Sequence, residues 1–342
     1  MKIAIDARYY GKSGIGRVLS GILDNLPYNN HEFYLIGSKD LEEKYPNAHL
    51  LLDETNPFSK SGIVKFNKEF NAICDAILIP NFIIPFGIKI PIYSYVHDLL
   101  FLDMPSVSTK GFIDYKIKKY LFKRCFKKAN KIFCVSEFTI GRCNHYFPKY
   151  SNKLVLNYPG LSKEVIEYAD THEVIKNKEN SIVYVGNVKP HKGIDILLEA
   201  FGKLNDETLT LKIIGQKENF LVGTSFDENK YSNVIFTGRI SDEELLDEIS
   251  KAKYLVQPSR YEGFGIPPLE ALYLGTIPLV SNIDVFKEVY GGLPVVFFEN
   301  SLELEELLKA NVIVDMCSRG YILKKYNYKT VVEVILAYLI GV

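Results

Sequence analysis

Short apolar runs alternate with longer amphipathic stretches along the whole chain. The apolar runs predict strands at residues 2–6, 33–37, 76–80, 92–96, 131–135, 181–186, 209–215, 233–238, 254–259 and 277–281. Helical patterns run from near Arg17 to Pro27, over 193–204, from Ser241 to Ala252 and over 267–274, where Gly275 ends the pattern. Ser241 and Glu244 have the spacing of a capping box. Strands that alternate with helices in this way predict βαβ units and a parallel sheet in each half of the chain.

A polar segment at 170–181 separates the two halves. The length of 342 residues suits two domains of ~150–170 residues each. We expect a doubly wound, Rossmann-like α/β domain over 1–165, a second over 166–327, and a C-terminal helix over 328–342 that returns to the first. Ligands of such sheets bind beyond the carboxyl ends of the strands.

Composition removes several classes of protein. An apolar fraction of 47% excludes a disordered chain. The longest apolar region, 76–96, is interrupted by three prolines and cannot cross a bilayer as a helix, and the N-terminus does not have the pattern of a signal peptide. Five cysteines without a C-x-x-C pair argue against a disulfide framework or zinc site and favour a reducing compartment.

Although the net charge of the chain is zero, its two halves carry net charges of opposite sign. Residues 1–160 carry 22 basic and 14 acidic side chains, whereas 161–342 carry 19 and 27. The segment 109–133 alone has nine Lys or Arg and one acid, and its aromatic residues recur at helical spacing. A solvated helix face explains this pattern as well as the alternative, which is contact with an anionic membrane surface or a lipid-linked acceptor. That alternative points to Lys116, Lys119, Lys123 and Lys127.

The strongest chemical signal lies between Glu262 and Glu270, in the sequence EGFGIPPLE. Pro267 suits the first helical position, so the preceding loop offers free backbone amides for a phosphate. Carboxylates repel phosphate and bind hydroxyls, so a ligand with both a phosphate and diols, such as a nucleotide sugar, fits the pair. Without the G-F-G between them, a helix charge and a surface charge would explain the two glutamates equally well.

Three further loops follow predicted strands. VGNVKPHKG (185–193) places Lys189 and Lys192 where they could bind a diphosphate, although a solvated basic loop explains the lysines too. The glycines of 11–16, including Gly14 and Gly16, allow a close backbone approach to a ligand or form a structural turn. His97 could bind a sugar hydroxyl, but a lone histidine is more often structural. No spacing typical of metal ligands occurs.

These pieces, in this order, resemble glycosyltransferase family 4, whose members are retaining enzymes of the GT-B fold. The resemblance runs nearly the whole chain, through IDARYYGKSGIGRV, YVHDLLFLDMP, FCVSEFTIGR and VYVGNVKPHKGIDILLEAF to the E-x7-E spacing of SRYEGFGIPPLEA. The variants G-I-G-R, H-D-L and P-H-K-G look most like bacterial mannosyl- and rhamnosyltransferases of surface polysaccharides. The resemblance implies an α/β GT-B fold with two domains facing each other across a cleft.

The resemblance also implies roles for individual residues. Catalysis would involve His97, Lys192 and Glu262. Donor binding would involve Gly14, Gly16, Lys189, Lys192, Gly215, Arg239, Glu262, Gly263, Phe264, Gly265 and Glu270. Glu270 would bind the ribose, Glu262 the donor sugar, and the amides of Phe264 and Gly265 the sugar or diphosphate. Many family members have Arg at the position of Asn187, and Lys189 is a candidate to replace it.

The implied reaction transfers a hexose, first of all mannose from GDP-mannose, to a hydroxyl of a growing, lipid-linked capsule or O-antigen glycan. The acceptor would attack from the side of the departing diphosphate, without a metal or other cofactor. The resemblance implies a cytoplasmic protein, with the inner face of the bacterial membrane as a further site.

A UDP-sugar-dependent relative and a non-catalytic nucleotide-sugar-binding homologue remain alternatives. A nicotinamide dehydrogenase shares the α/β pattern, but the spacing G-x-x-G-x-G differs from the dinucleotide fingerprint.

Overall fold

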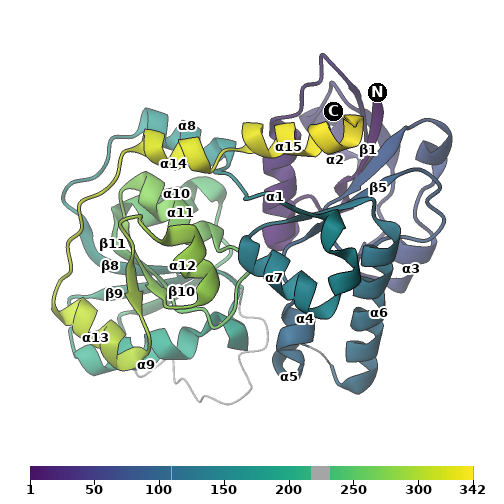
Figure 1. Ribbon diagram of the computed structural model, residues 1–342. Coiled ribbons are helices and arrows are strands. Elements are labelled where there is room, and N and C mark those ends of the chain that lie inside the picture. Colours follow the sequence, from purple (N-terminus) through teal and green to yellow (C-terminus); the bar gives the residue numbers. More distant parts are fainter. Residues whose placement is uncertain (109, 217–231, 342) are drawn as a thin grey trace. The chain divides into compact units, whose positions relative to one another are not determined.

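The computed structural model describes residues 1–108, 110–216 and 232–341. The chain divides into two compact units, Met1–Ser162 together with Tyr326–Val342, and Lys163–Lys325. Each unit has a parallel sheet flanked by helices (Figure 1).

The sheet of the first unit has seven strands in the order β3-β2-β1-β4-β5-β6-β7. The strands are β1 (Lys2–Asp6), β2 (Glu32–Gly37), β3 (His49–Leu52), β4 (Ala76–Ile79), β5 (Ile92–Val96), β6 (Lys131–Cys134) and β7 (Leu154–Leu156). Every residue of β4 is buried, as expected for a parallel strand covered on both faces. Ile3 of β1 pairs with Phe33 of β2 on one side and with Ala76 of β4 on the other. The strand order therefore reverses between β1 and β4.

The helices of this unit are α1 (Ser13–Asp24), α2 (Asp40–Lys44), α3 (Lys60–Val64), α4 (Leu100–Asp103), α5 (Pro105–Ser108), α6 (Phe112–Lys128), α7 (Glu137–Tyr146) and α15 (Tyr328–Ile340), with short 3-10 helices at Ala7–Tyr9, Glu69–Ala72 and Pro148–Lys153. The C-terminal helix α15 packs on α1. A Cβ at Gly21 of α1 would lie 2.1 Å from the ring of Tyr328, so this contact requires glycine.

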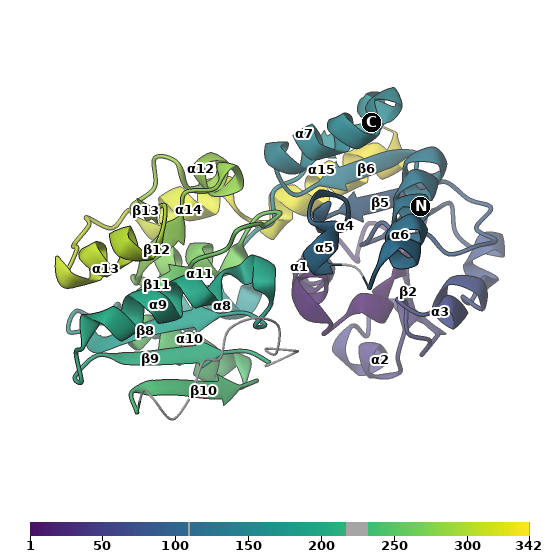
Figure 2. The same cartoon turned by 90° about the horizontal axis from the view of Figure 1, so that it is seen from below.

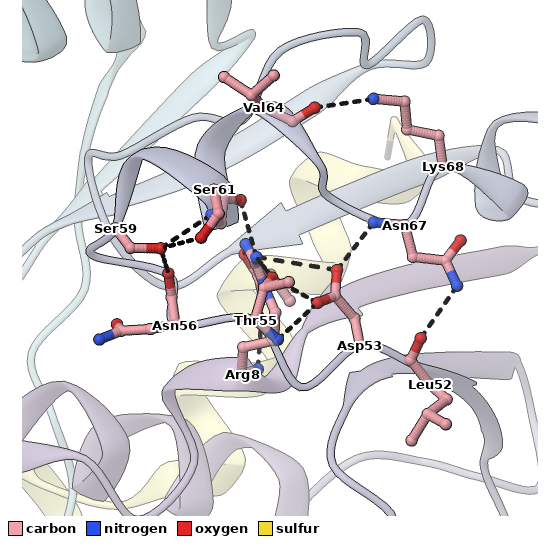
Figure 3. A network of polar contacts seen from close by, with 12 residues as sticks. Arg8, Leu52, Asp53, Thr55, Asn56, Ser59, Ser61, Val64, Asn67 and Lys68 are labelled. Carbon is pink, nitrogen blue, oxygen red and sulfur yellow. Dashed lines mark hydrogen bonds and ion pairs between the residues drawn. The ribbon is translucent and has the colours of Figure 1, made fainter.

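The turn after β1 is fixed by a buried ion pair. The guanidinium of Arg8 makes two hydrogen bonds of 2.8 Å with the carboxylate of Asp6, and both side chains are at most 1% exposed. Arg8 also donates to Thr55 Oγ1 at 2.9 Å and to the Gly62 carbonyl at 2.8 Å (Figure 3). Asp53 accepts from the backbone of Asn67 and lies 3.9 Å from Arg8. The network thus joins β1 and the turn after it to α3 and to the segment before α3.

The sheet of the second unit has six parallel strands in the order β10-β9-β8-β11-β12-β13 (Figure 2). Its strands are β8 (Glu179–Val185), β9 (Thr210–Ile214), β10 (Val234–Gly238), β11 (Ala252–Gln257), β12 (Ile277–Ser281) and β13 (Val296–Phe298). Its helices are α8 (Lys163–Thr171), α9 (Ile194–Leu204), α10 (Asp242–Lys251), α11 (Ile266–Leu274), α12 (Asp284–Tyr290), α13 (Ser301–Lys309) and α14 (Arg319–Lys325), with a 3-10 turn, η4, at Pro190–Lys192. The order reverses between β8 and β11, and ligands of doubly wound sheets bind beyond the carboxyl ends of the strands at such a position.

Most of the predicted elements are present, and both domains have the predicted doubly wound α/β architecture. The capping box of Ser241 and Glu244 forms at the start of α10. The prediction was wrong at two helix starts. The first helix begins at Ser13 rather than near Arg17, which places Gly14 and Gly16 inside α1. Helix α11 begins at Ile266, so Pro267 is its second residue and Glu270 lies beyond its first turn.

The described ranges contain no helix that is long and apolar enough to cross a membrane. They also contain no group of three His, Cys, Asp or Glu side chains placed to hold a metal ion.

Candidate functional site

Two loops of the second unit meet where its strand order reverses. One follows β8 and spans 186–193, and the other follows β11 and spans 258–265. The backbone amides of Arg260 and Tyr261 donate to the carbonyl of His191, at 2.8 and 3.4 Å. A Cβ at Gly193 would lie 1.9 Å from the carbonyl oxygen of Pro258, and Gly193 has a φ of +64°. Glycine is therefore required here for both the conformation and the close approach of the loops.

A side-chain ion pair reinforces this junction. Arg260 makes a bidentate contact with Asp195 at the start of α9, with distances of 2.7 and 2.5 Å. The same guanidinium donates to the carbonyl of Pro190 at 3.0 Å. Planar, bidentate pairs of this kind fix geometry as well as adding energy. The two loops therefore form one connected platform.

The central contact of the platform joins Lys192 to Glu262. The Lys192 Nζ lies 2.6 Å from Glu262 Oε1, and the two side chains are 23% and 11% exposed. Glu262 Oε1 also accepts from Ser259 Oγ at 2.8 Å and from Gln257 Nε2 at 3.4 Å. The contacts of the Glu262 carboxylate found in the described part of the chain all involve Oε1. This arrangement leaves Oε2 as the oxygen for a further donor.

The N-terminus of α11 lies beside Glu262. Gly265 precedes this nine-residue helix with a φ of +86°, and a Cβ there would lie 2.5 Å from the ring of Phe286. Phe264 is buried, and the carbonyl of Gly265 accepts from Tyr290 Oη. The amides at this end can bind an anion. Glu270 is the fifth residue of α11 and is fully buried.

The other residues of this unit that the sequence predicted to bind the donor lie in loops that follow strands, at the carboxyl end of the sheet. Lys189 is exposed on the loop after β8, and Gly263 lies between Glu262 and Phe264. Gly215 follows β9, and a Cβ there would lie 2.2 Å from the Gly186 carbonyl, so a structural requirement accounts for this glycine. Arg239 is exposed directly after β10.

His97 belongs to the first unit, at the carboxyl end of β5. Its Nε2 lies 2.8 Å from the carbonyl oxygen of Pro80, and its ring stacks on Tyr95 with centroids 5.7 Å apart. Because a carbonyl can only accept, Nε2 carries the proton and Nδ1 has the lone pair. Burial lowers the pKa of His97 from 6.5 to about 4. The imidazole is therefore neutral at pH 7.

The glycines of α1 differ from each other. A Cβ at Gly16 would lie 2.6 Å from the carbonyl oxygen of Tyr9, so the helix needs glycine there to approach the turn after β1. A Cβ at Gly14 would meet no described atom within 4 Å, so its surroundings leave room for a ligand.

The four predicted lysines of α6 share one exposed face. Lys116, Lys119, Lys123 and Lys127 are spaced by three or four residues and all are exposed.

The structure adds residues that the sequence did not single out. Ser259 and Gln257 contact Glu262. Ser259 could have been found from the sequence, because it is the serine of the S-x-x-E spacing that ends at Glu262. The pair of Arg260 and Asp195 spans 65 positions and has no local signal. His191 is a further case, because burial lowers its pKa to about 4 and its Nδ1 has no partner in the described part of the chain.

The part of the chain that forms this platform matches a known protein family. Residues 167–310 match the family model described as Glycosyl transferases group 1, and this range contains both loops of the site. This part of the chain is therefore similar to group 1 glycosyltransferases.

Relatives and solved structures agree with this assignment. Serotype-specific mannosyltransferase WbdA of Escherichia coli is 30% identical over 188 residues, which cover 50% of this chain and 23% of WbdA. O-antigen chain mannosyltransferase RfbU of Salmonella typhimurium is 29% identical over 197 residues, which cover 57% of this chain and 53% of RfbU. The chain thus spans about half, or less, of the length of these relatives. The structure of Anabaena Alr3699/HepE in complex with UDP-glucose has a TM-score of 0.68 and 16% identity, with full coverage of both chains. The fold is GT-B, as expected from the sequence.

Proposed function

We propose that this protein is a glycosyltransferase that moves a hexose from a nucleotide sugar to a hydroxyl of a growing glycan. The observation that carries the proposal is the contact of Lys192 with Glu262, on two joined loops at the strand reversal of a domain similar to group 1 glycosyltransferases. This contact holds Lys192, which can bind a diphosphate, beside Glu262, which can bind sugar hydroxyls.

The chemistry follows from what each group can bind. A diphosphate carries more negative charge than one carboxylate, so it competes with Glu262 for Lys192 and for the amides at the start of α11. Glu262 then accepts from donor-sugar hydroxyls. Lys192 and the amides stabilise the charge that develops on the leaving diphosphate, which is the electrostatic contribution that most lowers such barriers.

The remaining roles are part of the same proposal. Glu270 binds the ribose, Phe264 and Gly265 offer amides, and Lys189, Gly215, Arg239 and Gly263 complete the donor site. Gly14 and Gly16 approach the diphosphate, and neutral His97 accepts a hydrogen bond from a sugar hydroxyl through Nδ1. The acceptor attacks from the side of the departing diphosphate, an oxygen of the diphosphate takes its proton, and configuration is retained without a metal.

The donor that we propose is GDP-mannose, supported by the two related proteins that are named mannosyltransferases. The acceptor is a lipid-linked bacterial surface glycan, in line with the O-antigen in the name of one of them. A UDP-sugar is the alternative donor, because a solved structure that matches the whole chain is a complex with UDP-glucose.

We also propose that the protein works in the cytoplasm, at the inner face of the membrane, through the outer face of α6. The inner side of this helix is buried through Phe122, Cys125 and Phe126. The outer side combines exposed lysines with four large apolar side chains, each more than half exposed: Phe112, Ile113, Ile117 and Tyr120. The one acid of the helix, Asp114, is paired with Lys118 at 2.9 Å. Apolar and basic groups on one face are typical of binding at an anionic lipid surface.

A thermal-shift panel with GDP-, UDP-, ADP- and dTDP-sugars tests the donor site. A ligand at ~100 times its dissociation constant adds about 2.7 kcal/mol of stability. We expect a shift with the GDP series that Glu270→Ala abolishes, followed by transfer of mannose to a glycan acceptor. A shift without transfer or donor hydrolysis would favour a non-catalytic nucleotide-sugar-binding protein.

A further inference from the structure

We infer that Ser259 and Gln257 are positioning residues that allow Lys192 to move from Glu262 to the diphosphate of the donor. This inference rests on the proposed function of the site. It concerns two side chains that make no contact with the donor in that proposal and act through Glu262.

The two residues form a short chain of hydrogen bonds that ends on the carboxylate. Gln257 Nε2 donates to Ser259 Oγ at 3.0 Å, and Ser259 Oγ donates to Glu262 Oε1 at 2.8 Å. Gln257 and Ser259 are 1% and 0% exposed. Ser281 Oγ donates to the carbonyl of Ser259 and fixes the backbone beneath it. These two donors are therefore held in place, and both hydrogen bonds point toward the Glu262 carboxylate.

These hydrogen bonds become important when Lys192 moves away from Glu262. The Glu262 side chain is only 11% exposed, so removal of its one cation leaves a poorly hydrated carboxylate. The loss of one partner from a buried ion pair is expensive because the remaining charge is uncompensated. Hydrogen bonds from neutral donors to a carboxylate are stronger than those between neutral groups and offset part of that cost. Ser259 and Gln257 are in place to do this.

The same two donors select which oxygen faces the sugar. Ser259 and Gln257 hold Oε1 whether or not Lys192 is present, so Oε2 stays directed away from them. The carboxylate keeps one orientation while its cation is exchanged.

A double-mutant cycle tests the inference. The dissociation constant of GDP-mannose, and of UDP-glucose as the alternative donor, is measured by titration calorimetry for wild type, Ser259→Ala, Glu262→Gln and the double variant. We expect Ser259→Ala to weaken binding about tenfold, or about 1.4 kcal/mol, because release of Lys192 becomes more costly. In the Glu262→Gln background, which has no carboxylate to stabilise, the same substitution should change binding less than about twofold.

A matched control separates this effect from general damage. Ser250 is also a buried serine of this unit, but its hydroxyl contacts Tyr168 and the carbonyl of Asp247, not Glu262. Ser250→Ala should leave donor binding unchanged. An equal loss for Ser259→Ala in both backgrounds, or no loss in either, would overturn the inference.

Crystal structures of donor-free wild type and Ser259→Ala test the orientation without any donor. A rotated Glu262 carboxylate in the variant supports the inference, and an unmoved one contradicts it. Failure of the wild type to bind either nucleotide sugar would overturn the proposed function, and the crystal structures would still decide the role of Ser259.

Discussion

Lys192 Nζ lies 2.6 Å from Glu262 Oε1, although 70 positions separate the two residues in the chain. The contact depends on the strand order, because β8 and β11 are neighbours in the sheet but not in the sequence. It also depends on Gly193, the residue after Lys192, which allows the two loops to touch. A local motif at each position thus becomes one site only through the topology of the sheet.

The first prediction concerns this pair. Lys192→Ala and Glu262→Ala should each lower turnover at least ~100-fold, since loss of one preorganised electrostatic contact has an effect of this size. The measurement is the initial rate of sugar transfer at saturating donor. Lys203→Ala is the matched control, because Lys203 pairs with Glu199 on the exposed side of α9, and its rate should equal that of wild type. Near-normal turnover in either site variant would remove that residue from the mechanism.

The second prediction concerns the buried pair of Arg8 and Asp6. Arg8→Met should lower the free energy of unfolding by ~3–5 kcal/mol, because it leaves a buried carboxylate without its cation. Urea unfolding measures the difference. Lys203→Met removes an exposed pair and should leave the free energy of unfolding nearly unchanged. Equal effects of the two substitutions would show that the Arg8 network does not stabilise the turn after β1.

The third prediction is a pH dependence of stability. The pKa of His97 is lowered to about 4 in the folded protein and is near 6.5 in an unfolded chain. Between these values the unfolded chain binds a proton that the folded protein does not, so the free energy of unfolding falls as pH is lowered from 6.5. His191 contributes in the same direction, because its pKa is also lowered to about 4.

His97→Gln tests this prediction, because the amide can still donate to the carbonyl of Pro80 but does not titrate in this range. Urea unfolding between pH 5 and 6.5 should show a shallower slope for His97→Gln than for wild type. Combination with His191→Gln should reduce the slope again. Parallel curves for wild type and His97→Gln would contradict a neutral His97 in the folded protein.

The sequence predicted the interior of both sheets better than their edges. The three strands not predicted, β3, β7 and β13, have three or four residues each and all lie at an edge of a sheet. In β3 none of the four residues is buried, so the chain has no clear apolar signal there. Such strands form because a neighbour offers hydrogen bonds, which local sequence does not record.

The same limit applies to the site. Glu262 and Lys192 stand in local motifs with recognisable chemistry, and both could be named from sequence. Asp195 lies in an ordinary helical pattern, and its bidentate contact with Arg260 exists only because two distant loops meet.

The last prediction concerns the outer face of α6. The wild-type chain should sediment with vesicles that contain phosphatidylglycerol and not with pure phosphatidylcholine vesicles. A basic residue near an anionic surface contributes about 1 kcal/mol to binding, so reversal of four lysines should weaken binding at least ~100-fold. The substituted residues are Lys116, Lys119, Lys123 and Lys127, each changed to Glu.

The control must have the same net charge, because total charge alone affects binding to an anionic surface. Four exposed lysines elsewhere in the first unit provide it when changed to Glu: Lys39, Lys44, Lys60 and Lys65. This control should retain most of the binding if the outer face of α6 is the docking surface. The apolar residues make a separate contribution, so the double variant Ile113→Ser, Ile117→Ser should weaken the binding that remains at high salt, where charges are screened. Equal losses in the two charge-reversed proteins would mean that diffuse charge, and not this helix, attracts the chain to lipid.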